Sequence, residues 1–570
     1  MHIPPQYRTA ESFERDFGDP ADPHSRLSFI TALERDEREQ YPSEQHALLD
    51  SWHFPELYIP AECGGQLKSF EEVLALLRAL SRRDLTVAES HVITFLGALP
   101  VWIAGSDDQK RLASGLIRGG GKIAFALTER THGGDLLANE LEAREDGDRL
   151  LISGEKWLIG NATCSTAMTL FARTRAEGGP RGFSLLFADK RLLDPATFHH
   201  LPKVKTVGLR GAELSGICFD RCAVPAAACI GPAGTGFELA LKALQVTRIL
   251  CTGLSLGAGD TALRLAVDFA VTRRLYGGSV FDIPHARSTL ANAFLDLLIC
   301  DCVAISAARA LQACPGQASV WSAVAKFFVP ATVEKVMRDL SVVLGARFFL
   351  RDGHPWSMFQ KMVRDSSIVS VFEGSTLVQL QALGLQLEQL TTEPARPAPD
   401  LGRRLETVFS LRMPLPSFAP DQLDLFSRDG DDAVAGIPFL CDQIRSATAS
   451  DASRTAMLRV SAEQQRLAAD VRQARGQSGR SAALLQLAKR FAHLHAAACC
   501  GHFWIYNRDI LGEFFGQEEW LSTCLNRLRS EDGTMVEDGD VERELLDRSR
   551  HGWLFSAVPF QLASQGTVNG

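Results

Sequence analysis

Residues 366–380 have the sequence SSIVSVFEGSTLVQL, which places one carboxylate, Glu373, between an apolar run and the start of a helix. The run at 368–372 predicts a short strand, and Ser375 follows it as a candidate N-terminal cap. Leucines then recur at three- and four-residue steps over 377–390, which is typical of a half-buried helix. A carboxylate among apolar side chains loses hydration, which disfavours its charged form and suits a general base. A solvated Glu at a helix entrance is the alternative interpretation of this stretch alone.

The composition describes a soluble globular protein of several domains. The chain has 570 residues, of which 46% are hydrophobic and 22% are charged. A net charge of −8 argues against nucleic acid as a main partner. The 13 cysteines form no CxxC pair and no metal-ligand spacing, so we expect reduced thiols and no metal site. The N-terminus lacks a basic-then-apolar leader, and no uncharged run reaches spanning length, which predicts a cytoplasmic protein without a transmembrane segment.

Changes in hydrophobic period divide the chain. Residues 1–121 have helical spacing, whereas 122–230 break into short apolar runs that predict strands, with a hairpin turn at Asp146-Gly147. Residues 231–390 return to long helical patterns.

The end of the chain continues in the same way. Residues 391–400 contain three prolines and predict a stiff linker, and 401–570 are again helical. The predicted fold is therefore mainly α with a central β domain. It has an N-terminal helical domain, a small β-barrel or sandwich, a four-helix-type bundle and an additional C-terminal helical domain.

Several motifs occur in one order along the chain. They are FALTERTHGGD at 125–135, GEKWLIGN at 154–161, VGLRGAELSGICFDRCAVP at 207–225, TRRLYGGSV at 272–280 and VRDSSIVSVFEGST at 363–376. Together they resemble the acyl-CoA dehydrogenase family, whose members carry TEPxAGSD, GEKxWITN, a segment ending in FEDVRVP, and QRxxFGxPI. The resemblance covers about residues 43–390. Long-chain members of the family also carry a helical C-terminal extension.

This resemblance implies a bound FAD. It places Phe125, Leu127 and Thr128 along the flavin edge, and Leu158, Ile159 and Gly160 beside the reactive N5 atom. Arg273 and Tyr276 match residues that reach the pyrophosphate and adenine from a neighbouring subunit. The same alignment assigns further FAD contacts to Gly133, Gly134, Val342, Gly345 and Ser375. It assigns substrate contacts to Gly134, Arg248 and Gly374, with Arg248 near the thioester.

The resemblance also implies the reaction. Glu373 is expected to take the α-proton of an acyl thioester, carried by coenzyme A or by an acyl carrier protein, while flavin N5 accepts the β-hydride. Some members place the base one residue before an Arg on an earlier helix, but Thr247 stands there in this chain. An electron-transfer flavoprotein is a possible electron acceptor, and a homodimer or homotetramer is expected. The alternatives are a flavin oxidase or monooxygenase that uses O2, or a non-catalytic flavin-binding subunit.

Five positions depart from the family pattern. Arg130 replaces a Pro, Gly134 a Ser, Gly160 a Thr, Thr272 a Gln and Val342 a Gln. At Gly160 the departure removes a hydrogen-bond donor near N5 and is expected to leave space that a water or a different substrate fills.

Overall fold

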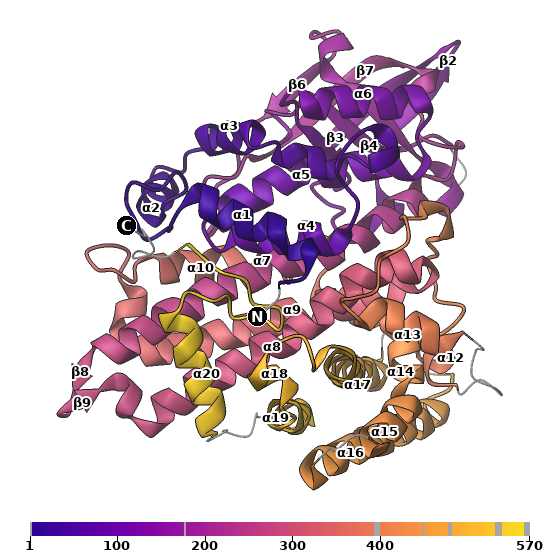
Figure 1. Ribbon diagram of the computed structural model, residues 1–570. Coiled ribbons are helices and arrows are strands. Elements are labelled where there is room, and N and C mark those ends of the chain that lie inside the picture. Colours follow the sequence, from indigo (N-terminus) through magenta and orange to yellow (C-terminus); the bar gives the residue numbers. More distant parts are fainter. Residues whose placement is uncertain are drawn as a thin grey trace.

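The computed structural model describes residues 3–175, 178–392, 400–446, 450–476, 481–529 and 538–563. Figure 1 shows the N-terminal helices and a β sheet in the upper part of the view, long helices across the middle and further helices below. The fold is mainly helical with a curled β domain, which confirms the predicted class. Most of the predicted linker lies outside the described residues, because 393–399 are not among them.

The N-terminal part is helical because its apolar residues recur at helical spacing behind good caps. At the start of α6, Ser106 and Gln109 form a capping box in which each side chain bonds the other residue's backbone. At the start of α4, Ser69 accepts a bond from the Glu72 backbone. The helices are α1 (Arg8–Phe17), α2 (Phe29–Glu37), α3 (Ser43–Ser51), α4 (Phe70–Ser81), α5 (Leu85–Ala104) and α6 (Asp107–Arg118).

The β domain is one curled, seven-stranded sheet in which β1, β4, β2, β3, β7 and β6 are neighbours in that order and β5 pairs with β4. Alternate residues face opposite sides: Ile123 and Phe125 join the helical core, whereas Ala124 and Ala126 join a second core within the domain. The predicted hairpin turn joins β2 to β3. The strands are β1 (Ile123–Ala126), β2 (Glu142–Asp146), β3 (Arg149–Gly160), β4 (Ala167–Arg173), β5 (Phe183–Asp189), β6 (Phe198–Leu201) and β7 (Leu214–Pro225).

The bundle is built on α7 (Gly236–Thr272), α8 (Pro284–Ala313) and α9 (Ala318–Leu344), followed by α10 (Met358–Ser366), α11 (Thr376–Gly384) and α12 (Leu387–Thr391). A small hairpin, β8 (Arg274–Leu275) and β9 (Gly278–Ser279), separates α7 from α8. Helix α7 crosses α4 closely at Gly257, where an added Cβ would lie 1.9 Å from Ser81 Oγ. Any side chain at Gly257 would therefore push the two helices apart.

The C-terminal region packs on the bundle as a helical layer. Arg309 of α8, buried with Glu71 of α4, also donates hydrogen bonds to the backbone carbonyls of Thr407, Val408 and Ser410. The helices are α13 (Leu401–Phe409), α14 (Asp432–Ala435), α15 (Ile437–Ser446), α16 (Asp451–Gln473), α17 (Ala482–Asn507), α18 (Glu513–Gly516), α19 (Glu519–Arg529) and α20 (Gly539–Arg550).

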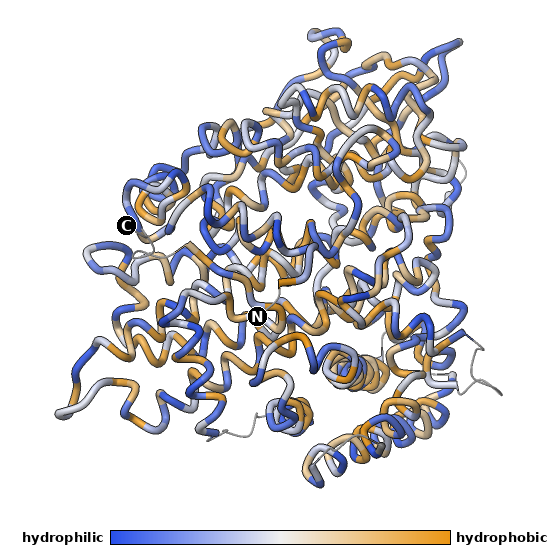
Figure 2. Tube along the Cα trace, viewed as in Figure 1, coloured by the Kyte–Doolittle hydropathy of each residue, from blue (hydrophilic) through white to orange (hydrophobic). Residues whose placement is uncertain are grey.

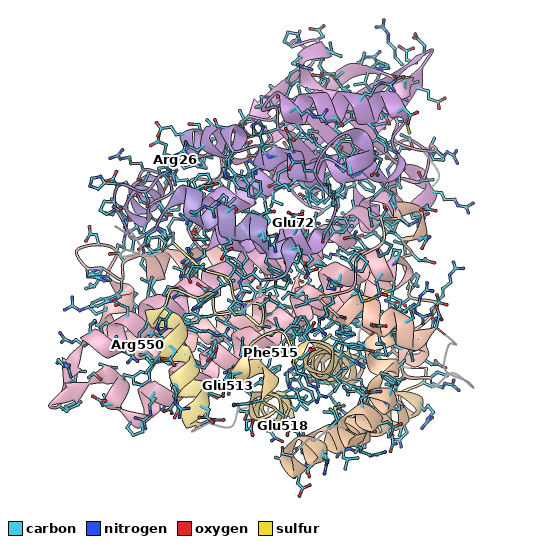
Figure 3. All side chains as sticks on the ribbon, in the orientation of Figure 1. Arg26, Glu72, Glu513, Phe515, Glu518 and Arg550 are labelled. Carbon is cyan, nitrogen blue, oxygen red and sulfur yellow. The ribbon has the colours of Figure 1, made fainter. Side chains whose placement is uncertain are left out.

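Side-chain packing explains how this layer is held. Figure 2 shows hydrophobic and hydrophilic residues alternating along the outer helix α16, and its buried residues follow a helical spacing. Phe515 of α18, labelled in Figure 3, is buried with its ring centroid 4.1 Å from that of Trp520. Beyond α20, the backbone N–H of Phe555 bonds Asp260 in the middle of α7. The region is therefore an integral part of the described fold.

By length and composition alone, three helices are apolar enough to cross a membrane: Leu85–Ala104, Gly236–Thr272 and Pro284–Ala313. Within the most apolar windows of these helices, 72%, 83% and 100% of the residues are buried inside the protein. Their apolar character is thus used in packing against other helices. The expectation of no transmembrane segment considered uncharged runs only, whereas these three helices qualify with up to two charged residues in a window.

The structure contradicts one expectation about the stretch around Glu373 and divides the helix expected by another. Residues 368–372 form successive turns instead of a strand, with local bonds such as Val371 N to Ile368 O at 2.9 Å. The leucine pattern over 377–390 is divided between α11 and α12, and Leu377 is 50% exposed. Ser375 does stand at the N-cap of α11, but its side chain makes no capping bond.

Candidate active site

Glu373 lies in the turn between α10 and α11, in an unusual backbone conformation. Its φ is +56°, and that of Gly374 is +99°. A non-glycine residue with positive φ costs on the order of 1–3 kcal/mol and persists where surrounding contacts hold it. Glycine suits position 374 because a φ of +99° strains any other residue, and an added Cβ would also lie 2.7 Å from Gln379 Nε2 and 3.0 Å from Arg248 Nη2. The turn is a tightly packed point of the fold.

Three residues on one side of α7 hold Glu373. The Thr247 hydroxyl donates to Glu373 Oε2 at 2.6 Å, and the Cys251 thiol lies 3.7 Å from the same oxygen. Arg248 Nε donates to the backbone carbonyl of Glu373 at 2.7 Å. Thr247 and Cys251 are one helical turn apart, so both reach the carboxylate from the same face. Arg248, expected near the thioester, is here an anchor of the turn itself.

A buried lysine of α9 stands behind the same turn. Lys326 Nζ donates to the carbonyl of Val369 and lies 4.2 Å from the ring centroid of Phe372. Burial lowers the pKa of Lys326, and the charges of Cys251 and Glu373 offset this lowering only in part. Burial, with Glu373 nearby, raises the pKa of the Cys251 thiol well above its ordinary value. The neutral thiol is therefore a donor or a packing group here, not a thiolate.

A second carboxylate, Glu89 of α5, belongs to this neighbourhood and was not predicted. Burial, followed by the charges of Glu373 and Asp365, raises the pKa of Glu89 to about 8. Its Oε2 atom is buried and has no hydrogen-bond partner among the described residues. The signal that would have found it is the single acidic residue in the mostly apolar stretch 85–104.

Hydrogen bonds join the two β-domain motifs at 125–135 and 154–161. Thr128 follows β1 and exchanges backbone and side-chain bonds with Trp157 of β3, at 3.1 and 2.9 Å. Lys156 is buried and donates to Glu129 at 2.8 Å and to Asn139 at 2.6 Å. These bonds place the segment at 127–141 against β3, so the residues expected along the flavin edge meet those expected beside N5.

The side chains at this junction differ in their exposure. Phe125 and Ile159 are buried, and Leu127 is partly buried. Leu158 occupies a β-bulge with φ +58° and is 41% exposed, which is unusual for a large apolar side chain. Gly133 and Gly134 are exposed, and nothing would lie within 4 Å of an added Cβ at either. The junction thus presents an uncovered apolar residue beside an open glycine loop.

Two departures from the family pattern have structural explanations. Arg130, at the position of the family's Pro, lies 4.7 Å from the ring centroid of Trp157 and pairs with Glu155. At Gly160 the expectation of empty space is wrong, because an added Cβ would lie 2.4 Å from Ile93 Cδ1. The side chain of Ile93 on α5 fills the volume beside Gly160.

The remaining predicted contacts lie elsewhere on the chain. Tyr276, at the β8–β9 turn, is 97% exposed with φ +53°, and Arg273 at the end of α7 is also exposed. Val342 near the end of α9 is 68% exposed, and Gly345 has φ +56°. Arg273 follows Thr247 by about 26 residues of helix, which places the two about 39 Å apart along α7.

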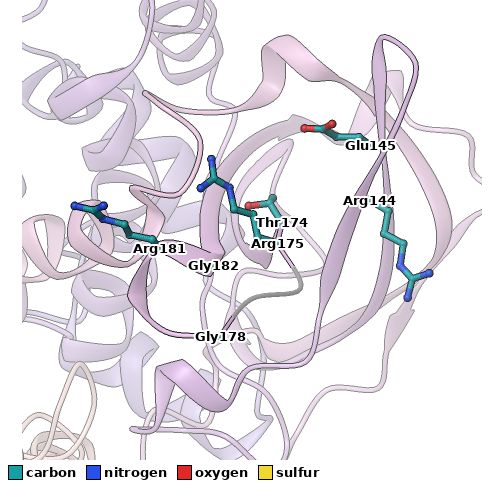
Figure 4. Close-up of a pocket in the computed structure, with 7 residues that line it drawn as sticks. All are labelled: Arg144, Glu145, Thr174, Arg175, Gly178, Arg181 and Gly182. Atoms are coloured by element: carbon teal, nitrogen blue, oxygen red, sulfur yellow. The ribbon is translucent and has the colours of Figure 1, made fainter.

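A cavity of about 710 Å³ lies in the β domain, apart from all these residues. Its lining residues, shown in Figure 4, are Arg144, Glu145, Thr174, Arg175, Gly178, Arg181 and Gly182. In Figure 4 the Arg144 side chain points away from those of Arg175 and Arg181. Because no predicted site residue lines it, this cavity does not define the candidate active site.

A curled β domain joined to a helical bundle is the architecture of the acyl-CoA dehydrogenase folds that are structural neighbours of this chain. The middle-domain family model of acyl-CoA dehydrogenases matches residues 124–222, and the C-terminal-domain model matches residues 234–387. The chain therefore carries the middle and C-terminal domains of the acyl-CoA dehydrogenase family, as its motifs predicted.

Individual relatives agree with this assignment. A probable acyl-CoA dehydrogenase of Mycobacterium tuberculosis, FadE25, is 27% identical over 349 residues, which are 61% of this chain and 88% of that protein. Butyryl-CoA dehydrogenase of Megasphaera elsdenii superposes with a TM-score of 0.61 at 23% identity, covering 67% of this chain and 97% of its own.

A longer structure extends the likeness to the C-terminal region. An acyl-CoA dehydrogenase of Bacillus anthracis, solved in complex with FAD, superposes with a TM-score of 0.69 at 18% identity. The superposed region covers 96% of this chain and 91% of the Bacillus anthracis chain. The helices after residue 400 therefore belong to a fold that is shared with at least one other protein of this kind.

Proposed function

We propose that this protein is an FAD-dependent acyl-CoA dehydrogenase in which Glu373 removes the α-proton of an acyl thioester. The observation that carries the proposal is the carboxylate of Glu373, held by Thr247 in a strained turn of the family's C-terminal domain. Glu373 is one of eight described non-glycine residues with positive φ, and such strained residues cluster at catalytic positions. The named relatives act on acyl-CoA substrates, which supports the same substrate class for this chain.

The residues at the β1–β3 junction fit an FAD. The exposed Leu158 offers apolar surface to a flat ring system, and the open backbone at Gly133 and Gly134 lets a ligand approach closely. When bound, the flavin supplies the acceptor for the substrate's β-hydrogen. The chain's own part is to position the thioester and to take the α-proton on the Glu373 carboxylate.

Arg273 and Tyr276 fit the other end of the cofactor only if a second copy of the chain provides them. At about 39 Å from Thr247 along one straight helix, Arg273 cannot reach the same site as Glu373. Arg273 and Tyr276 are both exposed, Tyr276 to 97%, so both are accessible to a second copy of the chain. We therefore propose a homodimer or larger homo-oligomer, in which Arg273 meets the neighbour's FAD pyrophosphate.

Around the base, each neighbour has a separate task. The Thr247 hydroxyl directs Glu373 Oε2 and leaves the other oxygen for the substrate proton. Arg248 holds the backbone of the turn, and Lys326 holds the segment before it through Val369. Because these donors are fixed before substrate arrives, little reorganisation is needed during proton transfer.

The test is a visible spectrum of the purified protein, followed by anaerobic addition of acyl-CoA thioesters of increasing chain length. We expect a yellow protein with about one FAD per chain whose flavin absorbance bleaches with the preferred thioester. A protein that neither contains nor takes up FAD would contradict the proposal. Repeating the panel with acyl carrier protein thioesters identifies the acyl carrier. Reoxidising the reduced flavin with air or with an electron-transfer flavoprotein identifies the electron acceptor.

A further inference from the structure

The proposed proton transfer leaves the second carboxylate of the site without a role. Glu89 is only partly buried as a residue, yet its Oε2 atom is buried and unpartnered among the described residues. A buried polar atom without a partner is costly, and a bound ligand is one kind of partner that satisfies such an atom. Glu89 therefore has a hydrogen-bonding capacity that the described chain does not use.

The position of Glu89 on α5 is defined by its neighbours on the same helical face. Thr86, three residues earlier, bonds Asp365 at the end of α10 at 3.1 Å. Ile93, four residues later, lies against Gly160 of β3. Residues at this spacing share one side of a helix, so Glu89 stands between the helix leading to the Glu373 turn and the N5-side strand.

The electrostatics support the same placement. Glu373 and Asp365 both contribute to the raised pKa of Glu89, after its burial. Glu89 in turn contributes to the raised pKa of Cys251, the thiol that lies 3.7 Å from Glu373 Oε2. Charges act measurably only over short distances in a protein, so Glu89 and Glu373 lie in one neighbourhood of the fold.

We propose that Glu89 is a specificity-determining residue that binds a hydrogen-bond donor, a hydroxyl or an amine, on the acyl group of the substrate. This inference rests on the proposed function, since it requires the acyl group to lie between Glu373 and Gly160. A plain alkyl chain would leave the carboxyl group of Glu89 desolvated and unpaired. An acyl group with a donor pairs with it, whether the carboxyl is neutral or ionised.

The experiment compares pairs of coenzyme A thioesters that differ only by a terminal hydroxyl or amino group in place of a methyl group. The acyl groups run from butanoyl to octanoyl for the hydroxyl pairs and from hexanoyl to octanoyl for the amino pairs. We expect the wild-type protein to favour the polar member of at least one pair by roughly tenfold or more in kcat/KM. Glu89→Gln keeps a hydrogen-bonding group and should retain the hydroxyl preference.

Glu89→Leu should reverse the preference toward the alkyl member, whereas Glu44→Leu, at an exposed position on α3, should leave it unchanged. Thermal unfolding of all variants shows whether a lost activity is a folding defect. A protein that prefers alkyl thioesters, or a Glu89→Leu variant with the wild-type ratio, would overturn the inference while the proposed function stands. Failure of every thioester to bleach the flavin would instead remove the proposed function and this inference together.

Discussion

The hydroxyl of Thr247 donates a hydrogen bond of 2.6 Å to Glu373 Oε2, across 126 positions of sequence. It joins the middle of α7 to the turn before α11 and fixes the orientation of the only carboxylate in that turn. Family members that carry their base on the earlier helix would have it at position 247. In this chain the same position instead carries a hydroxyl that bonds Glu373, the base that we propose.

We expect Thr247→Val, which keeps the shape but removes the donor, to slow flavin reduction by substrate roughly tenfold. One hydrogen bond to a charged group is worth about 1.5–3 kcal/mol, part of which other contacts recover. Stopped-flow reduction measures the rate, and Thr247→Ser is the matched control that keeps the hydroxyl. Equal rates in the valine variant and the wild type would show that the bond does not orient the base.

Glu373→Gln should abolish most of the reduction while leaving the fold and FAD content intact. The amide is nearly isosteric, so the turn keeps its packing, but loss of a general base costs roughly a hundredfold or more. Anaerobic bleaching by the preferred thioester gives the rate, and the visible spectrum gives the FAD content. A glutamine variant that bleaches as fast as the wild type would assign the base to another residue.

Gly160→Thr should destabilise the protein, because its Cβ would lie 2.4 Å from Ile93 Cδ1. Overpacking costs about 1–3 kcal/mol, and less where the end of the Ile93 side chain moves aside. Adding Ile93→Ala to the same chain should recover part of the loss, since the two side chains compete for one volume. Denaturant unfolding of the wild type, the two single variants and the double variant measures the coupling energy between the two substitutions. Strict additivity would mean that Ile93 does not fill the space beside Gly160.

Stability should fall on acidification partly through His502, which is buried in α17. Burial lowers the pKa of His502 to about 4 from an ordinary value near 6.5. A lowered folded-state pKa means that the unfolded chain binds the proton first. The contribution of His502 is therefore complete above about pH 6.5 and is lost between there and pH 4, by up to roughly 3 kcal/mol.

The matched variant is His502→Gln, whose amide can still donate to the Ala433 carbonyl that His502 bonds. We expect the difference in unfolding free energy between pH 7.5 and pH 5 to be smaller in this variant than in the wild type. An unchanged difference would show that His502 is not a source of the acid sensitivity.

Phe555→Ala tests the packing of the C-terminal region. Phe555 is fully buried, and its ring centroid lies 5.7 Å from that of Phe294 and 4.3 Å from the Arg264 guanidinium carbon. Removing a buried aromatic side chain costs about 3–5 kcal/mol. Phe426→Ala, at a 50% exposed position, is the control and should change the unfolding midpoint little. Equal effects of the two substitutions would mean that the segment after α20 is not part of the core.

Sequence alone determined the features that depend on neighbouring residues. The hydrophobic period located the β domain and the helical region after residue 400, and the turn residues located the hairpin between β2 and β3. The ordered motifs identified the family and singled out Glu373. These signals lie within short windows, where propensity and period act directly on the backbone.

Tertiary structure alone decided the contacts between distant segments. The apolar run at 368–372 has the composition of a strand, but no neighbouring strand is available to it among the described residues, so it closes local turns. The filling of Gly160 by Ile93, the support of Glu373 by Thr247 and the isolation of Glu89 each depend on how helices pack. Packing is set by the shapes of whole elements, and a local sequence pattern contains no information about which side chains will face one another.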